Sequence, residues 1–145
     1  MSGGAQGGRG ASVPGRRAIH RVRVGYVDTD KAGVVHHSAY LAWLEAARIE
    51  HWRAGGLDYR KFEVETGLAL PVVEAHLKYR APARFDDEVE VVTFVERVTR
   101  ARVFYRQEVR RGAQILVDAT IVLACVRMDQ ERVVSIPDDV SRVCG

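Results

Sequence analysis

One fourteen-residue stretch, residues 27–40, gathers most of the side chains in this chain that could do chemistry. It combines two carboxylates, a glycine and two adjacent imidazoles, and it ends in the first turn of an apolar helical pattern. The residues concerned are Asp28, Asp30, Gly33, His36, His37 and Tyr40. A loop of this composition can aim a carboxylate and the unpaired N–H groups of a helix start at one carbonyl group, as acyl transfer requires.

The length and the apolar pattern limit what surrounds this stretch. At 145 residues the chain fits a single domain with one core. No apolar run approaches the roughly 18 to 20 residues of a transmembrane helix, and residues 1–17 lack the apolar centre of a signal peptide. The two cysteines, Cys125 and Cys144, have no metal-type spacing. We therefore expect a cytoplasmic protein without a disulfide framework.

The basic excess of the chain lies at its N-terminus. The net charge is +3, and Arg9, Arg16 and Arg17 account for all of it. Without these three, 19 Lys and Arg remain against 19 Asp and Glu. Residues 1–17 also hold six of the 13 glycines, so we expect a disordered Gly/Arg-rich tail before a single domain at 18–145. The balanced domain argues against a nucleic-acid partner, although RNA binding through the tail is an alternative.

Hydrophobic periodicity predicts the elements that hold the stretch in place. Alternation over 19–26 predicts a strand, and the pattern over 38–54 predicts a long buried helix that ends at Gly55 and Gly56 with a left-handed cap. A second, shorter helix should run from Asp58 to Thr66 and stop at Gly67. The remaining strands are predicted at 68–80, 87–98, 101–110 and 114–128.

The short connections between the last three strands require antiparallel neighbours. A five-stranded antiparallel sheet wrapped around one long helix is the α+β architecture that this element order predicts. The outer face and the edges of such a sheet need cover, so we expect a homodimer or a dimer of dimers.

The element order and the loop together resemble the hotdog fold and the 4-hydroxybenzoyl-CoA thioesterase family. Within that family the chain is most similar to the YbgC-type acyl-CoA thioesterases, which are associated with the Tol-Pal envelope machinery. The matching loop residues are Asp28, Thr29, Asp30, Gly33, Val34, Val35, His37 and Tyr40. The likeness continues through residues 45–50 and 81–87 and covers roughly 19–137. One departure is His36, which stands where the family commonly has an aromatic residue.

The resemblance implies a thioester hydrolase without metal or cofactor. Asp30 would be the catalytic carboxylate, acting as a general base on water or as a nucleophile. The backbone N–H of His37 would polarise the thioester oxygen, and Gly33 would let the loop turn tightly beside the substrate. Supporting roles fall to Asp28, Val35, His36, Tyr40 and Glu45. The phosphates of CoA would meet Arg100, Arg102 and, more weakly, Arg84.

The sequence leaves alternative roles open for the same residues. Asp30 could simply cap a turn, and the side chain of His37 could pack at the helix start. The two aspartates and two histidines could in principle bind Zn or Fe, although adjacent histidines seldom point at one ion. The alternative functions are a hotdog dehydratase and a non-catalytic module that binds acyl-CoA or acyl-carrier protein.

Overall fold

The structure, a computed structural model, describes residues 17–145, so residues 1–16 of the predicted tail lie outside the described residues. Arg17 was assigned to the tail, but it opens the first strand because it pairs with Phe94. In chain order the elements are β1 (Arg17–Arg23), the single 3-10 turn η1 (Tyr26–Asp28), α1 (His37–Ala54), α2 (Tyr59–Thr66), β2 (Leu68–Ala69), β3 (Val72–Tyr79), β4 (Glu88–Val98), β5 (Arg102–Arg111), β6 (Gln114–Ala124), β7 (Val126–Arg127), β8 (Arg132–Val133) and α3 (Asp138–Cys144). None of the helices within residues 17–145 is both long and apolar enough to cross a bilayer.

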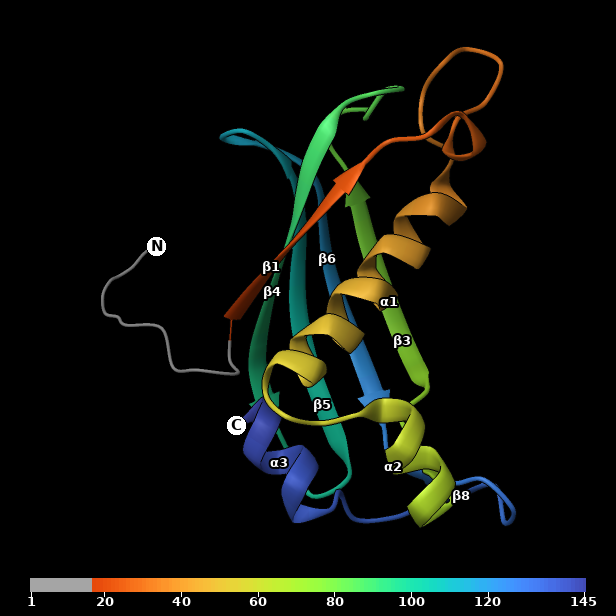
Figure 1. The fold of residues 1–145 in the computed structure, drawn as a ribbon, viewed down its shortest axis with the longest axis vertical. Helices are drawn as coiled ribbons and strands as arrows, with labels where there is room; N and C mark the ends of the chain where they lie inside the picture. Colours follow the sequence, from red (N-terminus) through yellow and green to blue (C-terminus); the bar gives the residue numbers. More distant parts are fainter. Residues whose placement is uncertain (1–16) are drawn as a thin grey trace.

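Five of these strands form one antiparallel sheet in the order β1-β4-β5-β6-β3. Figure 1 shows α1 lying along one face of this sheet. The strands β4, β5 and β6 are antiparallel neighbours, as their short connections predicted. The prediction of an α+β fold with a five-stranded antiparallel sheet and one long buried helix is confirmed.

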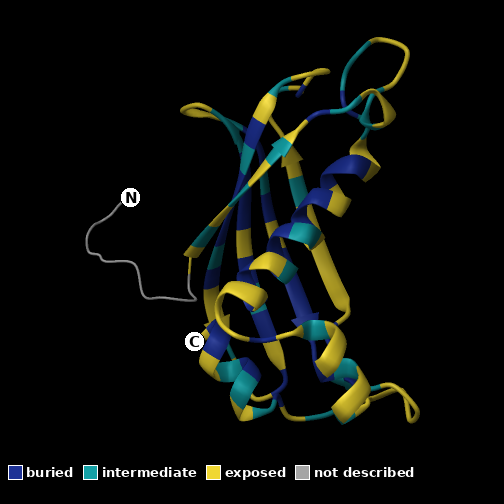
Figure 2. Cartoon of the chain, viewed as in Figure 1, coloured by how far each residue is buried: buried dark blue, intermediate teal, exposed yellow. Residues whose placement is uncertain are grey.

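The buried face of α1 repeats at helical spacing and forms the centre of the core. Its buried members are Ala39, Tyr40, Trp43, Leu44, Ala47, Arg48, His51 and Trp52. Figure 2 shows this buried stripe turned toward the sheet, whereas Leu41 and Glu45 on the outer side of α1 are exposed. The short helix α2 follows as predicted, because the Asp58 side chain accepts a hydrogen bond from Lys61 N and Gly67 adopts a φ of 69°.

Two predicted strands are each divided in the structure. The stretch 68–80 breaks between β2 and β3, where Pro71 has no N–H to donate to a ladder and the Leu70 N–H donates to the Tyr59 hydroxyl at 2.8 Å. The stretch 114–128 breaks at Cys125, whose N–H donates to the Ala101 carbonyl at 2.8 Å. The short strands β2, β7 and β8 then form a separate small sheet.

The C-terminal helix α3 was not predicted. It begins after Pro137, carries Asp138 and Asp139 in its first turn, and buries Val140 and Val143. It packs closely on the end of α1, since a Cβ on Gly55 would lie 2.7 Å from a methyl carbon of Val143. The predicted left-handed cap at Gly55 and Gly56 is formed by Gly56, whose φ is 95°, whereas Gly55 has a φ of −85°.

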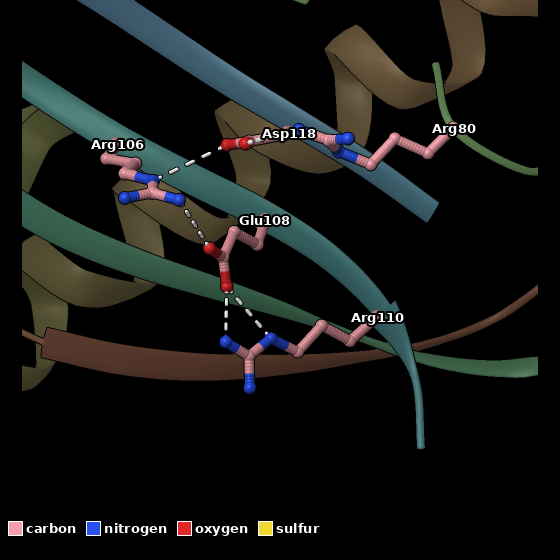
Figure 3. Close-up of polar contacts among 5 residues, drawn as sticks. All are labelled: Arg80, Arg106, Glu108, Arg110 and Asp118. Atoms are coloured by element: carbon pink, nitrogen blue, oxygen red, sulfur yellow. Dashed lines mark hydrogen bonds and ion pairs between the residues drawn. The ribbon is translucent and has the colours of Figure 1, made fainter. Parts of the chain in front are cut away.

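A network of charged side chains lies on the face of the sheet that points away from α1. Gln107 donates to the Leu44 carbonyl of α1, so its neighbours Arg106 and Glu108 point to the other face. Glu108 is only 4% exposed and accepts from Arg106 at 3.1 Å and from Arg110 Nε at 2.9 Å. Figure 3 shows the network continuing from Arg106 to Asp118, which also pairs with Arg80.

We expect Glu108→Gln to lower the free energy of unfolding by about 1–3 kcal/mol, because three charge-assisted hydrogen bonds from two arginines are weakened at a buried site. The loss stays in this range because Arg106 and Arg110 are partly exposed and can regain water. Urea denaturation measures the change. Glu96→Gln, at an exposed position of β4, is the matched control, and an equal loss in both variants would contradict the prediction.

A second prediction concerns His51 on the buried face of α1. Its ring is 2% exposed, and neither nitrogen has a hydrogen-bond partner among the described residues. Burial lowers the pKa of His51 below its ordinary value, so the unfolded chain binds this proton more readily than the folded one. The stability that the neutral ring contributes is therefore fully present above the ordinary histidine pKa. It is lost as the pH falls toward the lowered pKa of His51 in the folded protein.

Denaturation of the wild type at pH 7.5 and pH 5.5 should show a drop in stability that His51→Leu reduces. His76→Gln, at an exposed histidine of β3, should leave the drop unchanged. A pH dependence identical in all three proteins would refute the assignment to His51.

Candidate active site

The loop between η1 and α1 is held by its own backbone and by Asp28. The Asp28 carboxylate accepts a hydrogen bond from Gly25 N at 2.9 Å, and its carbonyl accepts from His36 N at 3.0 Å. A bridge between Thr29 and Val35 closes the loop across its base. Asp28 is thus engaged in fixing the loop.

Asp30 lies inside this closed loop and uses only one of its two oxygens. Its Oδ1 accepts from Ala32 N at 2.8 Å and from Val34 N at 3.4 Å. The second oxygen has no partner among residues 17–145, and the side chain is exposed. Gly33 makes the turn with a φ of 80°, a conformation that other residues rarely adopt. One oxygen of the Asp30 carboxylate therefore holds the turn, and the other has no partner among the described residues.

The segment before β4 fixes the loop against the helix. The Val35 N–H donates to the Ala83 carbonyl at 2.9 Å, and the Ala83 N–H donates to the Tyr40 hydroxyl at 3.0 Å. Burial raises the pKa of Tyr40, so its hydroxyl stays protonated at neutral pH. Val34 also bridges to Arg84. Loop, segment and first helical turn therefore form one hydrogen-bonded unit.

The N-terminus of α1 offers free donors at this unit. His36 occupies the N-cap position without capping the helix, because its ring turns back to the Val27 carbonyl at 3.2 Å and to Ser38 Oγ at 2.8 Å. The Nδ1 atom of His36 therefore accepts from the Ser38 hydroxyl, and its Nε2–H donates to the Val27 carbonyl, so the ring proton is assigned to Nε2. The N–H of His37 has no partner among the described residues, as expected in a first turn, where the helix dipole also favours negative charge.

A cavity of about 250 Å³ opens beside the helix tip, and we call it the loop cavity. His37 lines it, with its ring stacked on Tyr79 at 4.0 Å between ring centroids. The full lining is Val34, Val35, His37, Tyr40, Tyr79, Arg80, Ala81 and Pro82. The loop cavity thus joins the helix tip, the loop and the end of β3.

Several predicted site residues do not join this cavity. His36, which was given a supporting role, turns its ring back to the Val27 carbonyl within the loop. Glu45 is exposed two turns further along α1 and lines a different pocket. The four residues considered as metal ligands have separate partners, and residues 17–145 contain no group of three such side chains placed to hold a metal ion.

Of the three predicted CoA-binding arginines, only Arg84 lies at the loop end of the sheet. Arg100 and Arg102 follow β4, which begins beside the loop and runs for 11 residues, or roughly 35 Å, toward the opposite end. There Arg100 donates to Ser135 at 2.9 Å. Figure 1 shows this end of the sheet beside α2 and α3. Within one chain these two arginines are therefore remote from Asp30.

Sequence reasoning missed Tyr79 and Arg80, which line the loop cavity at the end of β3. The sequence signal for these two residues was weak, because the pattern around them indicates only the end of a strand before a proline turn. Their proximity to His37 depends on the 81–83 segment folding back onto the loop, which no local pattern reveals.

Comparison with known proteins places this geometry in a family. Residues 23–143 match the thioesterase-like superfamily. The acyl-CoA thioesterase YbgC of Haemophilus influenzae is 35% identical over 119 residues, covering 82% of this chain and 88% of that protein. A hypothetical protein of Thermus thermophilus has a crystal structure with a TM-score of 0.80 and 38% identity, covering 88% of this chain and 95% of that one.

A further solved structure is an aspartate-to-asparagine mutant of 4-hydroxybenzoyl-CoA thioesterase complexed with 4-hydroxybenzoyl-CoA. It has a TM-score of 0.81 and 25% identity, covering 90% of this chain and 99% of that one. The family match, the YbgC relative and the shared fold agree with the loop motif. The chain therefore belongs to the thioesterase-like superfamily, as a hotdog-fold protein of the YbgC type.

Proposed function

We propose that this protein hydrolyses acyl-CoA thioesters to a free carboxylic acid and CoA. The observations that carry the proposal are an uncommitted carboxylate oxygen on Asp30, in the closed loop, and the free N–H of His37 at the helix tip that follows this loop and lines the loop cavity, although Asp30 itself is not part of the lining. The names of the YbgC relatives and the substrate held by the 4-hydroxybenzoyl-CoA thioesterase mutant support acyl-CoA as the substrate class.

The chemistry needs little beyond these two groups. The thioester oxygen would lie at the helix tip, where the His37 N–H and the dipole stabilise the oxyanion that forms on attack. One such donor is typically worth about 3–4 kcal/mol in the transition state. Collapse of the tetrahedral intermediate then expels the CoA thiolate, which takes up a proton.

Asp30 can supply the attacking oxygen in two ways. As a general base it removes a proton from water, and the water oxygen bonds to the carbonyl carbon. As a nucleophile it attacks the carbon itself and forms a mixed anhydride, which water then hydrolyses to regenerate the carboxylate. Both routes use the free Oδ2, while Oδ1 holds the side chain in place through its hydrogen bonds from Ala32 N and Val34 N.

The position of Arg100 and Arg102 supports a homodimer as the functional unit, with a dimer of dimers as the larger form. Strand β3 is an edge of the sheet and is exposed along nearly its whole length (Figure 2). Antiparallel pairing of two β3 edges about a two-fold axis would turn the arginine end of one copy to the loop end of the other. Arg100 of the partner subunit would then lie about three strand spacings, or roughly 14 Å, across the sheet from β3.

The same proposal assigns the location and further partners. We place the protein in the cytoplasm, in keeping with acyl-CoA as substrate and with two buried, free cysteines. An acyl-carrier-protein thioester is the alternative substrate, and the YbgC likeness makes the Tol-Pal machinery a candidate partner.

Asp30→Asn should reduce kcat by about 100-fold or more, because the amide can still accept the turn hydrogen bonds but can neither take a proton nor attack. Release of CoA from a panel of acyl-CoAs, followed with a thiol reagent, measures the rate, and calorimetry measures binding of the unhydrolysed substrate. Asp58→Asn, at the N-cap of α2, is the control. If Asp30→Asn binds and hydrolyses like the wild type, the catalytic assignment is lost; if the wild type binds but releases no thiol, the protein is a binding module.

Ala75→Lys tests the proposed β3 edge, because a charge in the middle of the edge would face its own copy across the two-fold axis. Sedimentation should shift toward the monomer, and the KM for acyl-CoA should rise as the partner's arginines are lost. Thr120→Lys, an exposed position on β6, should keep both values. Unchanged sedimentation of Ala75→Lys would exclude this edge as the interface.

A further inference from the structure

The segment between β3 and β4, residues 81–87, is held by an arginine from another strand. Arg111 at the end of β5 donates from Nη1 to the Asp87 carboxylate at 2.7 Å and to the Pro82 carbonyl at 3.4 Å. Its Nη2 donates to Gln114 Oε1 at 2.9 Å, so the plane of the guanidinium is fixed from a second side. One side chain therefore connects the turn between β5 and β6 to both ends of this segment.

Arg111 and Asp87 fix the two peptide planes that flank Ala83. A peptide unit is planar, so the Pro82 carbonyl turns together with the Ala83 N–H, and the Arg84 N–H turns together with the Ala83 carbonyl. In the first plane, Arg111 binds the Pro82 carbonyl. In the second, the Arg84 N–H donates at 2.9 Å to the same Asp87 oxygen that accepts from Arg111. The ion pair therefore sets the orientation of both backbone groups of Ala83.

These two backbone groups are the ones that bind the candidate site. The Ala83 carbonyl accepts from Val35 at the end of the loop, and the Ala83 N–H donates to the hydroxyl of Tyr40 in the first turn of α1. Asp30 belongs to this loop, and the free His37 N–H belongs to the same helical turn. The separation between the carboxylate and the oxyanion donor is thus set at Ala83.

The ion pair itself contributes little to folding, because water reaches it. The side chains of Arg111 and Asp87 are 35% and 25% exposed. Burial alone would raise the pKa of Asp87, but the Arg84 N–H and Arg111 hold it below the ordinary value, so the pair is charged at neutral pH. The Asp87 carbonyl accepts from Val24 N at 2.9 Å, which gives the carboxylate a fixed base. Neither side chain of the pair lines the loop cavity, so an effect on the reaction would act through position.

We propose that Arg111 and Asp87 are positioning residues of the candidate active site. Their ion pair holds Ala83, and Ala83 holds the end of the loop and the helix tip at a fixed separation. The catalytic consequence rests on the proposed hydrolysis, because an attacking group and an oxyanion donor act only at the right distance from one carbonyl. The structural consequence can be measured without any substrate.

Arg111→Gln tests the catalytic consequence. A shorter, neutral side chain cannot bind Pro82 and Asp87 together, so kcat should fall about tenfold, whereas the KM for acyl-CoA should stay within about twofold because no substrate contact is removed. Arg111→Lys keeps the charge and should regain most of the lost kcat. Arg110→Gln, on the neighbouring arginine that pairs with Glu108 on the outer face, should keep the wild-type kcat. A wild-type kcat in Arg111→Gln, an equal loss in Arg110→Gln, or a change in KM alone would overturn the proposal.

The double variant tests whether the two residues act as one unit. Asp87→Asn keeps an oxygen for the Arg84 N–H but loses the charge that binds Arg111. If the pair acts together, Arg111→Gln with Asp87→Asn should have a kcat within about twofold of the slower single variant. Losses that multiply in the double variant would show two independent effects and reject the ion pair as their cause.

Amide hydrogen exchange in the substrate-free protein separates this proposal from the hydrolase assignment. In Arg111→Gln the Val35 N–H, which donates to Ala83, should exchange at least about tenfold faster. The Gly67 N–H, which follows α2 at the end of the molecule opposite the loop (Figure 1), should keep its rate. Unchanged exchange at Val35 overturns the proposal even in an active hydrolase. If the wild type releases no thiol, the hydrolase assignment fails, and the exchange rates still decide whether the ion pair holds the loop. Circular dichroism checks folding, and if Arg111→Gln does not fold, Asp87→Asn is measured in the same way.

Discussion

The geometry of the candidate site depends on the two hydrogen bonds of Ala83. Its carbonyl accepts from Val35 of the loop and its N–H donates to Tyr40 of α1, at a position that is fully buried. These bonds fix the loop and the helix tip to the same segment, so that Asp30 and the His37 N–H cannot move independently. Because buried backbone groups are costly to leave unpaired, a shift of any one of the three parts would disturb the other two.

The fold could be predicted wherever the deciding interaction is local. Helix α1 and the ends of strands β4, β5 and β6 could be predicted from hydrophobic periodicity and turn residues. The break at Pro71 was missed because the apolar pattern continues through it, although a missing N–H should have argued against an unbroken strand. The helix α3 was missed because it is short, yet Pro137 followed by two aspartates is a usual helix-start signal.

The same distinction holds for the site. Asp30, Gly33 and His37 fall within eight residues, so their association could be predicted from the sequence. Arg100 and Arg102 could not be placed, because the length and direction of β4 decide at which end of the sheet they lie. Tyr79 and Arg48 carry no motif. Their roles depend on contacts with residues far away in the chain, the stacking of Tyr79 on His37 and the bond of Arg48 to Gln107.

The arginines in this fold illustrate how the environment, and not the residue type, decides how each positive charge is compensated. On the outer face Arg106 and Arg110 are partly exposed and share the buried Glu108, so their charges are both paired and solvated. Arg48 on the inner face is buried and forms no ion pair among the described residues; it donates to the amide of Gln107 and interacts with the charge of Glu45. A buried cation that is partly satisfied adds little to stability compared with an apolar side chain of similar size.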